Sequence, residues 1–249
     1  MDTASAPRVF TCPCRQFVGH TACTIRRRES RKRSRDIATT TSPTANLWLD
    51  LAILPSVLMP IQKQRLNRAT VIDKAMLIAD AEGIDAVTLS RIASDAGVKQ
   101  PALYKHVTGI EELWMLLSLR ARDLLVDALS SAITGTTREH AVLAAAQAWR
   151  SFVQEHPGLY SATDRVPSVG DADIELSLTR VVATLTAALD GYQLTPAQRA
   201  HCARSLRSAL HGFCVLEKDS GHPEPYALDN SLTQLVELFI RGIETLEVH

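Results

Sequence analysis

The 249-residue sequence lacks any apolar run long enough to cross a membrane, which takes about 18–20 residues. The nearest stretch, LWLDLAILPSVLMP at 47–60, is shorter and is interrupted by Asp50, Pro55 and Pro60. A strand pattern, with apolar and polar residues in alternation, is also missing. We therefore expect a soluble, all-α protein with about nine helices and no membrane partner.

The motifs of common enzyme classes are missing too. The chain has no G-x-S-x-G nucleophile elbow, no phosphate-binding P-loop and no H-E-x-x-H zinc motif. Its histidines at 140, 156, 201 and 211 are scattered and have no evident nucleophile partner. These absences predict that there are no catalytic residues, no cofactor and no enzymatic activity.

Cysteine is scarce, and its count is odd. The five cysteines are Cys12, Cys14, Cys23, Cys202 and Cys214. An odd number without a cleavable signal peptide favours a reducing cytoplasm over a disulfide scaffold. The three N-terminal cysteines and His20 could be imagined as a zinc site, but the C-x-C spacing and the lack of a surrounding fold speak against it. We expect no metal.

Net charge is zero, but the charges are unevenly distributed along the chain. Residues 1–58 hold nine Arg and Lys against four Asp and Glu, whereas residues 108–249 hold eleven against eighteen. The run RRRESRKRSR at 26–35 is typical of a solvated, disordered segment. We interpret 1–58 as a disordered basic extension: a tail without function, a DNA-seeking arm, or sequence ahead of a true start at Met59. A basic front on an acidic body suggests an anionic partner.

Residues 59–108 form the first predicted domain, a DNA-binding head. Helical spacing of apolar residues begins near 66 and stops at Gly83, and Thr88 suits the N-cap of the next helix. Counting from Leu89 as position 1, a small residue (Ala93) falls at 5, a glycine (Gly97) at 9 and an apolar residue (Leu103) at 15. A helix-turn-helix needs this pattern, since the second helix crosses the small residue and the turn favours positive φ.

The second helix of this motif is too polar to be buried. With Val98 and Leu103 inward, the outward set is Lys99, Gln100, Pro101, Ala102, Tyr104, Lys105 and His106. Gln100 can pair with adenine, and Ala102 can touch a thymine methyl. Lys99, Lys105 and His106, with the hydroxyl of Tyr104, can reach phosphates. A solvated helix face is the alternative, but it does not explain an exposed tyrosine beside Lys and His.

TLSRIASDAGVKQPALYKHVTGIEELW at 88–114 resembles the DNA-binding head of the tetracycline-repressor family of bacterial regulators. The resemblance implies that Gln100, Pro101 and Ala102 read bases, that Tyr104, Lys105 and His106 hold the DNA backbone, and that Thr88 approaches a phosphate. Family members usually carry a lysine near the start of the fourth helix, whereas TGIEEL has Gly109 and Ile110 there. Lys105 stands where an aromatic residue is common and could replace part of that contact.

Residues 109–249 form the second predicted domain, a helical body. A long helix from Ile110 to about Ile133 should connect it to the head, and Thr136 with Glu139 suggests a capping box for the next. Further helices are predicted over 171–190, from a cap at Thr195 to about Lys218, and over 230–246.

Two further sites are predicted in the body. Apolar residues cover much of the last helix, which suggests a four-helix interface in a homodimer: Leu235, Val236, Phe239, Ile240, Ile243 and Leu246. A fully buried helix in one subunit is the alternative.

HGFCVLE at 211–217 and HPGLY at 156–160 resemble a C-terminal domain type of the same family, which implies a small-molecule pocket. Its candidate lining is Trp149, Phe152, Tyr160, Arg204, His211 and Phe213.

These patterns predict a dimeric regulator that binds palindromic operator DNA and is released by a small-molecule effector of unknown identity. An activator or a constitutive regulator of the same fold is an alternative. A non-specific DNA-packaging protein would fit the arginine run, but the acidic body and the base-reading residue types speak against it. An enzyme is disfavoured by the missing motifs.

Overall fold

The computed structural model describes residues 66–247. The basic extension predicted at 1–58, with its cysteines and His20, lies outside this range. Within it, no helix is long and apolar enough to cross a membrane.

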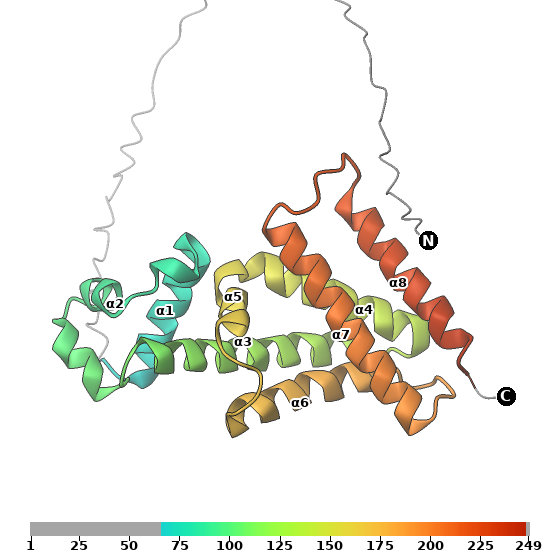
Figure 1. Cartoon of the computed structure of the whole chain (residues 1–249), viewed down its shortest axis with the longest axis horizontal. Helices are drawn as coiled ribbons and strands as arrows, with labels where there is room; N and C mark the ends of the chain where they lie inside the picture. The colour runs from blue at the N-terminus through green and yellow to red at the C-terminus, as the bar shows by residue number, and fades with distance from the viewer. Residues whose placement is uncertain (1–65, 248–249) are drawn as a thin grey trace, which may run out of the picture. The chain divides into compact units, whose positions relative to one another are not determined.

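Every regular element between residues 66 and 247 is a helix, and none is a strand, which confirms the all-α class. Figure 1 shows their arrangement. The elements are α1 (Arg68–Glu82), η1 (Ile84–Ala86), α2 (Leu89–Asp95), η2 (Gln100–Lys105), α3 (Ile110–Ile133), α4 (Arg138–Glu155), α5 (Pro157–Arg165), α6 (Ala172–Ala187), α7 (Pro196–Lys218) and α8 (Leu228–Glu244), where η marks a 3-10 helix.

Local signals begin and end the head helices as the sequence predicts. The side chain of Asn67 caps α1 and forms a reciprocal capping box with Thr70, while Gly83 ends the helix with φ of 89°. Thr88 caps α2, since its hydroxyl accepts from the backbone N–H of Arg91 at 3.1 Å. Gly97 makes the following turn with φ of 63°, a conformation that costs glycine little.

The head has its own hydrophobic core, which draws on more than residues 59–108. Val71, Ile92 and Leu103 are fully buried in it, together with Leu117 from α3 and Leu159 from α5. The first half of α3 and all of α5 therefore belong structurally to the head as much as to the body.

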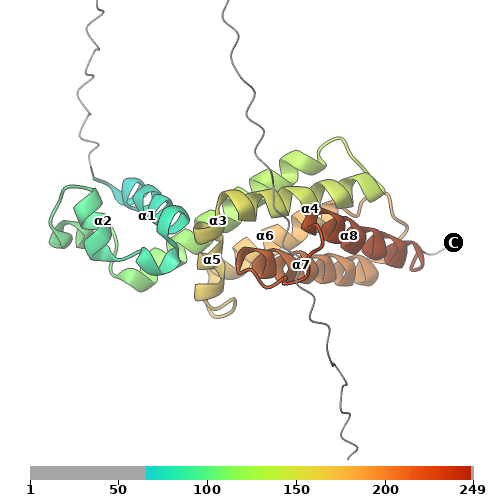
Figure 2. The same cartoon turned by 90° about the horizontal axis from the view of Figure 1, so that it is seen from above.

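The body forms around the second half of α3. Helices α4, α5 and α6 pack directly on α3, and α7 and α8 pack on α4 (Figures 1 and 2). A second core fills the space between these helices, with Leu129, Ala145, Leu185 and Leu206 fully buried. Helix α3 contributes residues to both cores and so joins the head to the body.

One local prediction is wrong. Thr136 and Glu139 form no capping box: α4 is preceded by Thr137, which makes no side-chain cap, and the Thr136 hydroxyl instead donates to the carbonyl of Ile133 at 2.8 Å. The sequence did not predict α5, the helix that begins at Pro157. The second helix of the motif is present, as a 3-10 helix.

Candidate functional site

The polar segment at 99–106 lies at the surface of the head and is held there by two buried apolar residues. Leu103 of η2 and Val107 just after it are buried, at 0% and 1% exposure. The predicted outward residues Lys99, Gln100, Pro101, Tyr104 and Lys105 are exposed, and Ala102 and His106 are half-buried. The structure thus brings the predicted reading residues together on one short element.

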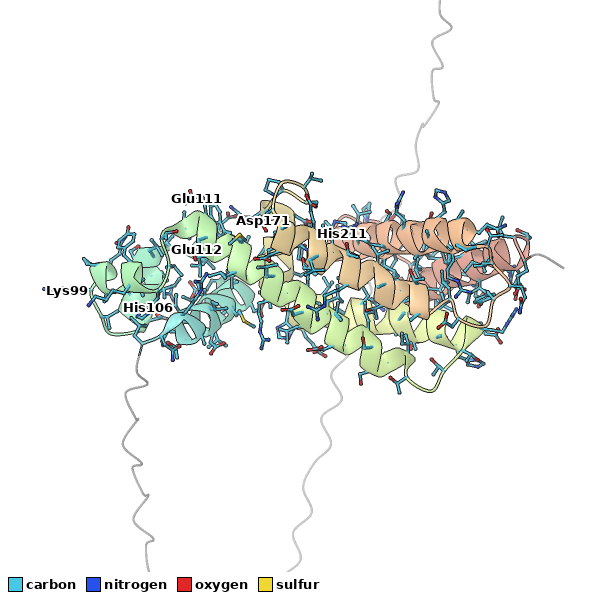
Figure 3. The ribbon with its side chains drawn as sticks, turned by 90° about the horizontal axis from the view of Figure 1, so that it is seen from below. Lys99, His106, Glu111, Glu112, Asp171 and His211 are labelled. Carbon is cyan, nitrogen blue, oxygen red and sulfur yellow. The ribbon has the colours of Figure 1, made fainter. Side chains whose placement is uncertain are left out.

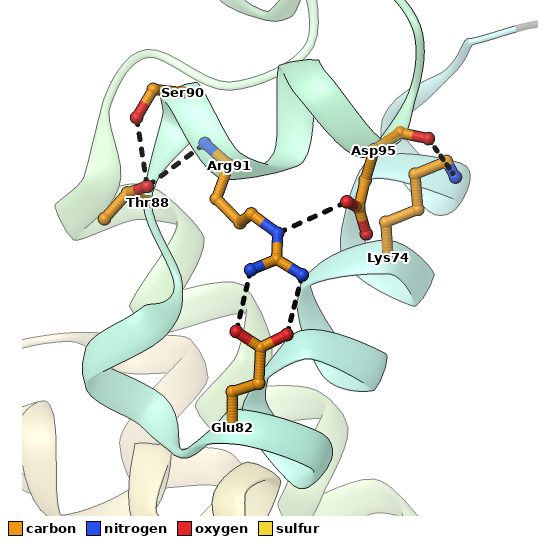
Figure 4. A network of polar contacts seen from close by, with 6 residues as sticks. All are labelled: Lys74, Glu82, Thr88, Ser90, Arg91 and Asp95. Carbon is orange, nitrogen blue, oxygen red and sulfur yellow. Dashed lines mark hydrogen bonds and ion pairs between the residues drawn. The ribbon is translucent and has the colours of Figure 1, made fainter.

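Ion pairs connect α2, the helix that precedes this segment, to α1. The guanidinium of Arg91 donates to both carboxylate oxygens of Glu82, at 2.6 and 2.7 Å, and to Asp95 at 3.3 Å (Figure 4). Lys74 Nζ reaches the carbonyl oxygen of Asp95 at 3.2 Å. The Arg91–Glu82 pair links α2 to α1, but these pairs are solvent-exposed and contribute little stability.

Basic groups lie at the outer end of the head. Figure 3 shows Lys99 projecting at the end of the head farthest from His211 in the body, with His106 nearby. The hydroxyl of Thr88 is exposed at the N-terminus of α2, where it also lies 3.1 Å from the hydroxyl of Ser90. A helix N-terminus favours negative charge, so a phosphate can approach here.

The N-terminus of α3 has the opposite character. Glu111 and Glu112 occupy its first turn. The carboxylate of Glu112 accepts from the N–H of Thr108 at 2.6 Å, a bond that lowers the pKa of Glu112, and it pairs with Arg68. A carboxylate therefore already occupies the place where other family members present a lysine, and no phosphate contact is expected here.

A polar cavity of about 170 Å³ lies in the body. Three of the six predicted pocket residues, Trp149, Tyr160 and His211, line it. The remaining lining is Arg122, Leu125, Thr163, Asp164, Ser168, Leu178, Val181 and Arg207. Side chains from five helices, α3 to α7, thus converge on one space.

A chain of hydrogen bonds orders one wall of this cavity. Trp149 Nε1 donates to the hydroxyl of Tyr160 at 3.1 Å, and that hydroxyl lies 2.7 Å from His211 Nδ1. Burial raises the pKa of Tyr160, so its phenol stays protonated. The other ring nitrogen of His211, Nε2, faces Asp164 Oδ1 at 3.5 Å.

The other three predicted pocket residues lie elsewhere. Phe152 is buried and packs its ring on Tyr160, behind the cavity wall. Arg204 is exposed on α7 and does not line the cavity. Phe213 borders a separate hollow between α7 and α8, where its ring packs against His222.

Sequence reasoning missed both arginines of the cavity. Arg122 carries a visible signal, because it stands among Leu117, Ala121 and Leu125 on the buried side of α3. A charged residue at a core position indicates either a paired charge or a site. Arg207 carries no comparable signal, since half-exposed arginines are common on α-helices.

The residues predicted for a dimer interface fall into two groups. Val236 and Ile243 are each 1% exposed and pack into the chain's own core. Leu235, Phe239 and Ile240 are half-buried and Leu246 is 43% exposed. Leu238 is 66% exposed beside them, at the edge of an apolar hollow lined by α7 and α8.

The short helix α5 joins the cavity to the head. Its N-terminus is held by Asp80 of α1, which accepts from the backbone N–H of Leu159 at 2.7 Å and from His156 Nδ1 at 2.8 Å. One turn later α5 carries Tyr160, Thr163 and Asp164 into the cavity wall. Helix α5 therefore connects the cavity wall to α1.

Known proteins share this architecture. A family described as bacterial regulatory proteins of the tetR family matches residues 71–114, and a tetracyclin repressor-like C-terminal domain matches 142–239. An uncharacterized HTH-type transcriptional regulator of Mycobacterium tuberculosis is 34% identical over 186 residues, 74% of this chain and 85% of that protein.

Two solved structures show the same fold. A protein of unknown function from Rhodococcus superimposes with a TM-score of 0.60 at 22% identity, covering 73% of this chain and 98% of its own. A tetracycline repressor variant from Acinetobacter baumannii, in complex with minocycline, gives 0.56 at 18% identity, covering 74% and 100%. The chain belongs to the tetracycline-repressor family and is a DNA-binding transcriptional regulator.

Proposed function

We propose that the chain is a dimeric, cytoplasmic repressor that leaves its operator when a small molecule enters the cavity of the body. The observation that carries the proposal is the juxtaposition of an exposed reading segment at 99–106 with a cavity that shares α3 and α5 with the head. Activation of transcription from a suitably placed operator needs the same DNA contacts.

In the proposed complex, η2 enters the major groove. Gln100, Pro101 and Ala102 face base edges, where a glutamine amide can form a bidentate pair with adenine. Lys99, Tyr104, Lys105 and His106 contact phosphates on the groove walls, with Thr88 at the start of α2. Gln100 Nε2 lies 3.4 Å from the Tyr104 hydroxyl, a weak bond that groups on DNA can replace.

A homodimer through α7 and α8 follows from the exposed apolar face of these helices. Leu238 and Leu246, with half-buried Leu235, Phe239 and Ile240, would pack against the same face of a second copy as a four-helix bundle. Two heads then meet two half-sites of a palindrome about one turn of DNA apart.

Release requires that the effector bind better when the two heads are wrongly spaced for DNA. Helices α3 and α5 would transmit the effect of ligand binding to the heads, since each lines the cavity and contributes to the head core. A repressor variant of the same fold is in complex with minocycline, which supports a small-molecule effector, and the cavity residues of this chain would determine which molecule binds.

The test compares operator and random DNA. A binding sequence is selected from random duplexes, and its affinity is measured against a scrambled duplex of equal length over a range of salt concentrations. We expect the selected site to bind at least about a thousandfold more tightly near physiological salt, because base contacts add to the phosphate contacts. Equal affinities at every salt concentration would overturn the proposal and favour a DNA-packaging protein.

Single substitutions separate reading from positioning. Gln100→Ala should reduce discrimination at one base pair by about 1–3 kcal/mol, whereas Lys105→Ala should weaken all sequences alike and make the salt dependence shallower. Both side chains are exposed, so neither change disturbs the core. A uniform loss for Gln100→Ala would contradict its role as a base reader.

A further inference from the structure

The cavity of the body contains a buried positive charge that no carboxylate pairs with. Arg122 is 4% exposed. Its guanidinium donates to the hydroxyl of Ser118 and, at 3.2 Å, to the carbonyl oxygen of Thr163. Among the described residues, no carboxylate forms an ion pair with it, although the charge of Asp164 acts on it from farther away, and burying a charge without a paired counter-ion is expensive.

A second guanidinium faces the same space. Arg207 of α7 lines the cavity and makes no hydrogen bond or ion pair with any residue between 66 and 247. Burial, and then the positive charge of Arg207, lower the pKa of Arg122. Two like charges, from α3 and α7, thus line one cavity, an arrangement that an anion between them would stabilise.

The cavity wall holds only one carboxylate, and it has another partner. Asp164 lies 3.5 Å from His211 Nε2, at the end of the hydrogen-bond chain from Trp149 through Tyr160. That chain orients the imidazole of His211 with Nε2 toward Asp164. Two guanidiniums against one carboxylate leave a surplus of one positive charge in the lining, which suits a monoanion.

Three of the remaining lining residues are aliphatic, and the volume is small. Leu125 lies on α3, one turn from Arg122, and Leu178 and Val181 lie on α6. The volume of about 170 Å³ is close to the roughly 150 Å³ that accommodates a benzene ring. A ligand here has room for one ring or a short alkyl chain besides its charged group.

We propose that the cavity binds a small organic monocarboxylate, with its carboxylate between Arg122 and Arg207 and its apolar part against Leu125, Leu178 and Val181. Guanidinium groups bind carboxylates through paired, charge-assisted hydrogen bonds. The inference rests on the proposed function, because it names the chemical class of the effector.

Calorimetry on the full-length protein tests the site with benzoate and hexanoate, each beside its amide, and with inorganic phosphate. We expect a carboxylate to bind at least about tenfold more tightly than the amide of the same shape, since only the carboxylate pairs with the guanidiniums. The proposal is overturned if neither carboxylate binds, if the amides bind equally well, or if phosphate binds more tightly than both.

The matched variants are Arg207→Gln and Arg204→Gln. Both change an arginine of α7, but only Arg207 lines the cavity. Arg207→Gln should weaken carboxylate binding about tenfold or more and leave amide binding unchanged, whereas Arg204→Gln should behave as the parent protein. Equal carboxylate affinity in Arg207→Gln and the parent would contradict the assignment. The change is made at Arg207 because Arg122 is part of the buried core.

DNA release separates this inference from the gating proposal. If a carboxylate binds through Arg207 but leaves operator affinity unchanged, the anion site is supported and the proposal of ligand-gated repression is contradicted. If no carboxylate binds while a neutral compound releases the operator, ligand-gated repression is supported and the anion site is contradicted.

Discussion

Gly158, at the start of α5, lies against the backbone of α1 with no room for a side chain. A Cβ at this position would lie 1.7 Å from the carbonyl oxygen of Ala79 and 2.8 Å from the backbone nitrogen of Asp80. Because backbone atoms cannot move aside as a flexible side chain does, the whole of α5 would have to shift.

Gly158→Ala should therefore destabilise the protein by about 1–3 kcal/mol or more, the range for overpacked sites. Urea unfolding measures the loss. Gly212→Ala is the control, since this glycine lies inside α7 with nothing within 4 Å of an added Cβ. Alanine there should leave stability unchanged or raise it by up to about 1 kcal/mol. A Gly158→Ala protein as stable as its parent would show that α5 is not closely packed against the backbone of α1 at this position.

Asp80 makes the polar half of the same contact. Asp80→Ala removes the acceptor for Leu159 N–H and for His156 Nδ1 and should cost about 1–3 kcal/mol, because it leaves buried donors unsatisfied. Asp73→Ala is the matched control, an exposed carboxylate on the same helix with no bonded partner among residues 66–247. Equal unfolding midpoints for the two variants would contradict the role of Asp80.

At the scale of single elements, the N-terminus of α2 has a structural role and a proposed DNA-binding role. The hydroxyl of Thr88 caps the helix, and the same exposed atom is placed to meet a phosphate. Thr88→Asp separates these roles, since aspartate is a good N-cap but repels phosphate.

Thermal unfolding of Thr88→Asp should match or exceed that of the parent, while operator affinity falls about tenfold or more at low salt. Thr88→Ser, which keeps both the cap and a neutral hydroxyl, should retain operator affinity close to the parent value. If Thr88→Asp binds DNA as well as Thr88→Ser does, the start of α2 lies away from the phosphates.

Elements that depend on local chemistry could be predicted from the sequence. The cap at Thr195, with Pro196 and Gln198, begins α7 as expected, because all its groups are close in the chain. The box at Thr136 and Glu139 failed because the threonine bonds back to α3. Helix α5 was missed because Pro157 both ends α4 and suits the first position of a new helix.

The cavity could be predicted only in part, for a related reason. Aromatic and histidine side chains suggested Trp149, Tyr160 and His211, but their meeting with Arg122 and Arg207 depends on how α3 and α7 pack. No spacing along the chain encodes that packing. The reading segment was easier to predict, since one short element carries all of its side chains.

At the scale of the whole molecule, DNA binding depends on the state of association. A single six-residue reading helix contacts few base pairs, so one head alone has little specificity. Two heads joined through α7 and α8 double the contacts without a second entropic cost of binding. Operator affinity should therefore fall when the proposed interface is broken.

Leu238→Glu tests this dependence. Leu238 is 66% exposed on α8, so a charge there should leave the fold intact but disfavour burial against a second copy. Sedimentation should show a monomer, and affinity for the palindrome should fall about a hundredfold, toward that for a half-site. Leu176→Glu is the control, because Leu176 is 60% exposed on α6 outside the hollow of α7 and α8. A Leu238→Glu dimer with parental affinity would place the interface on another face.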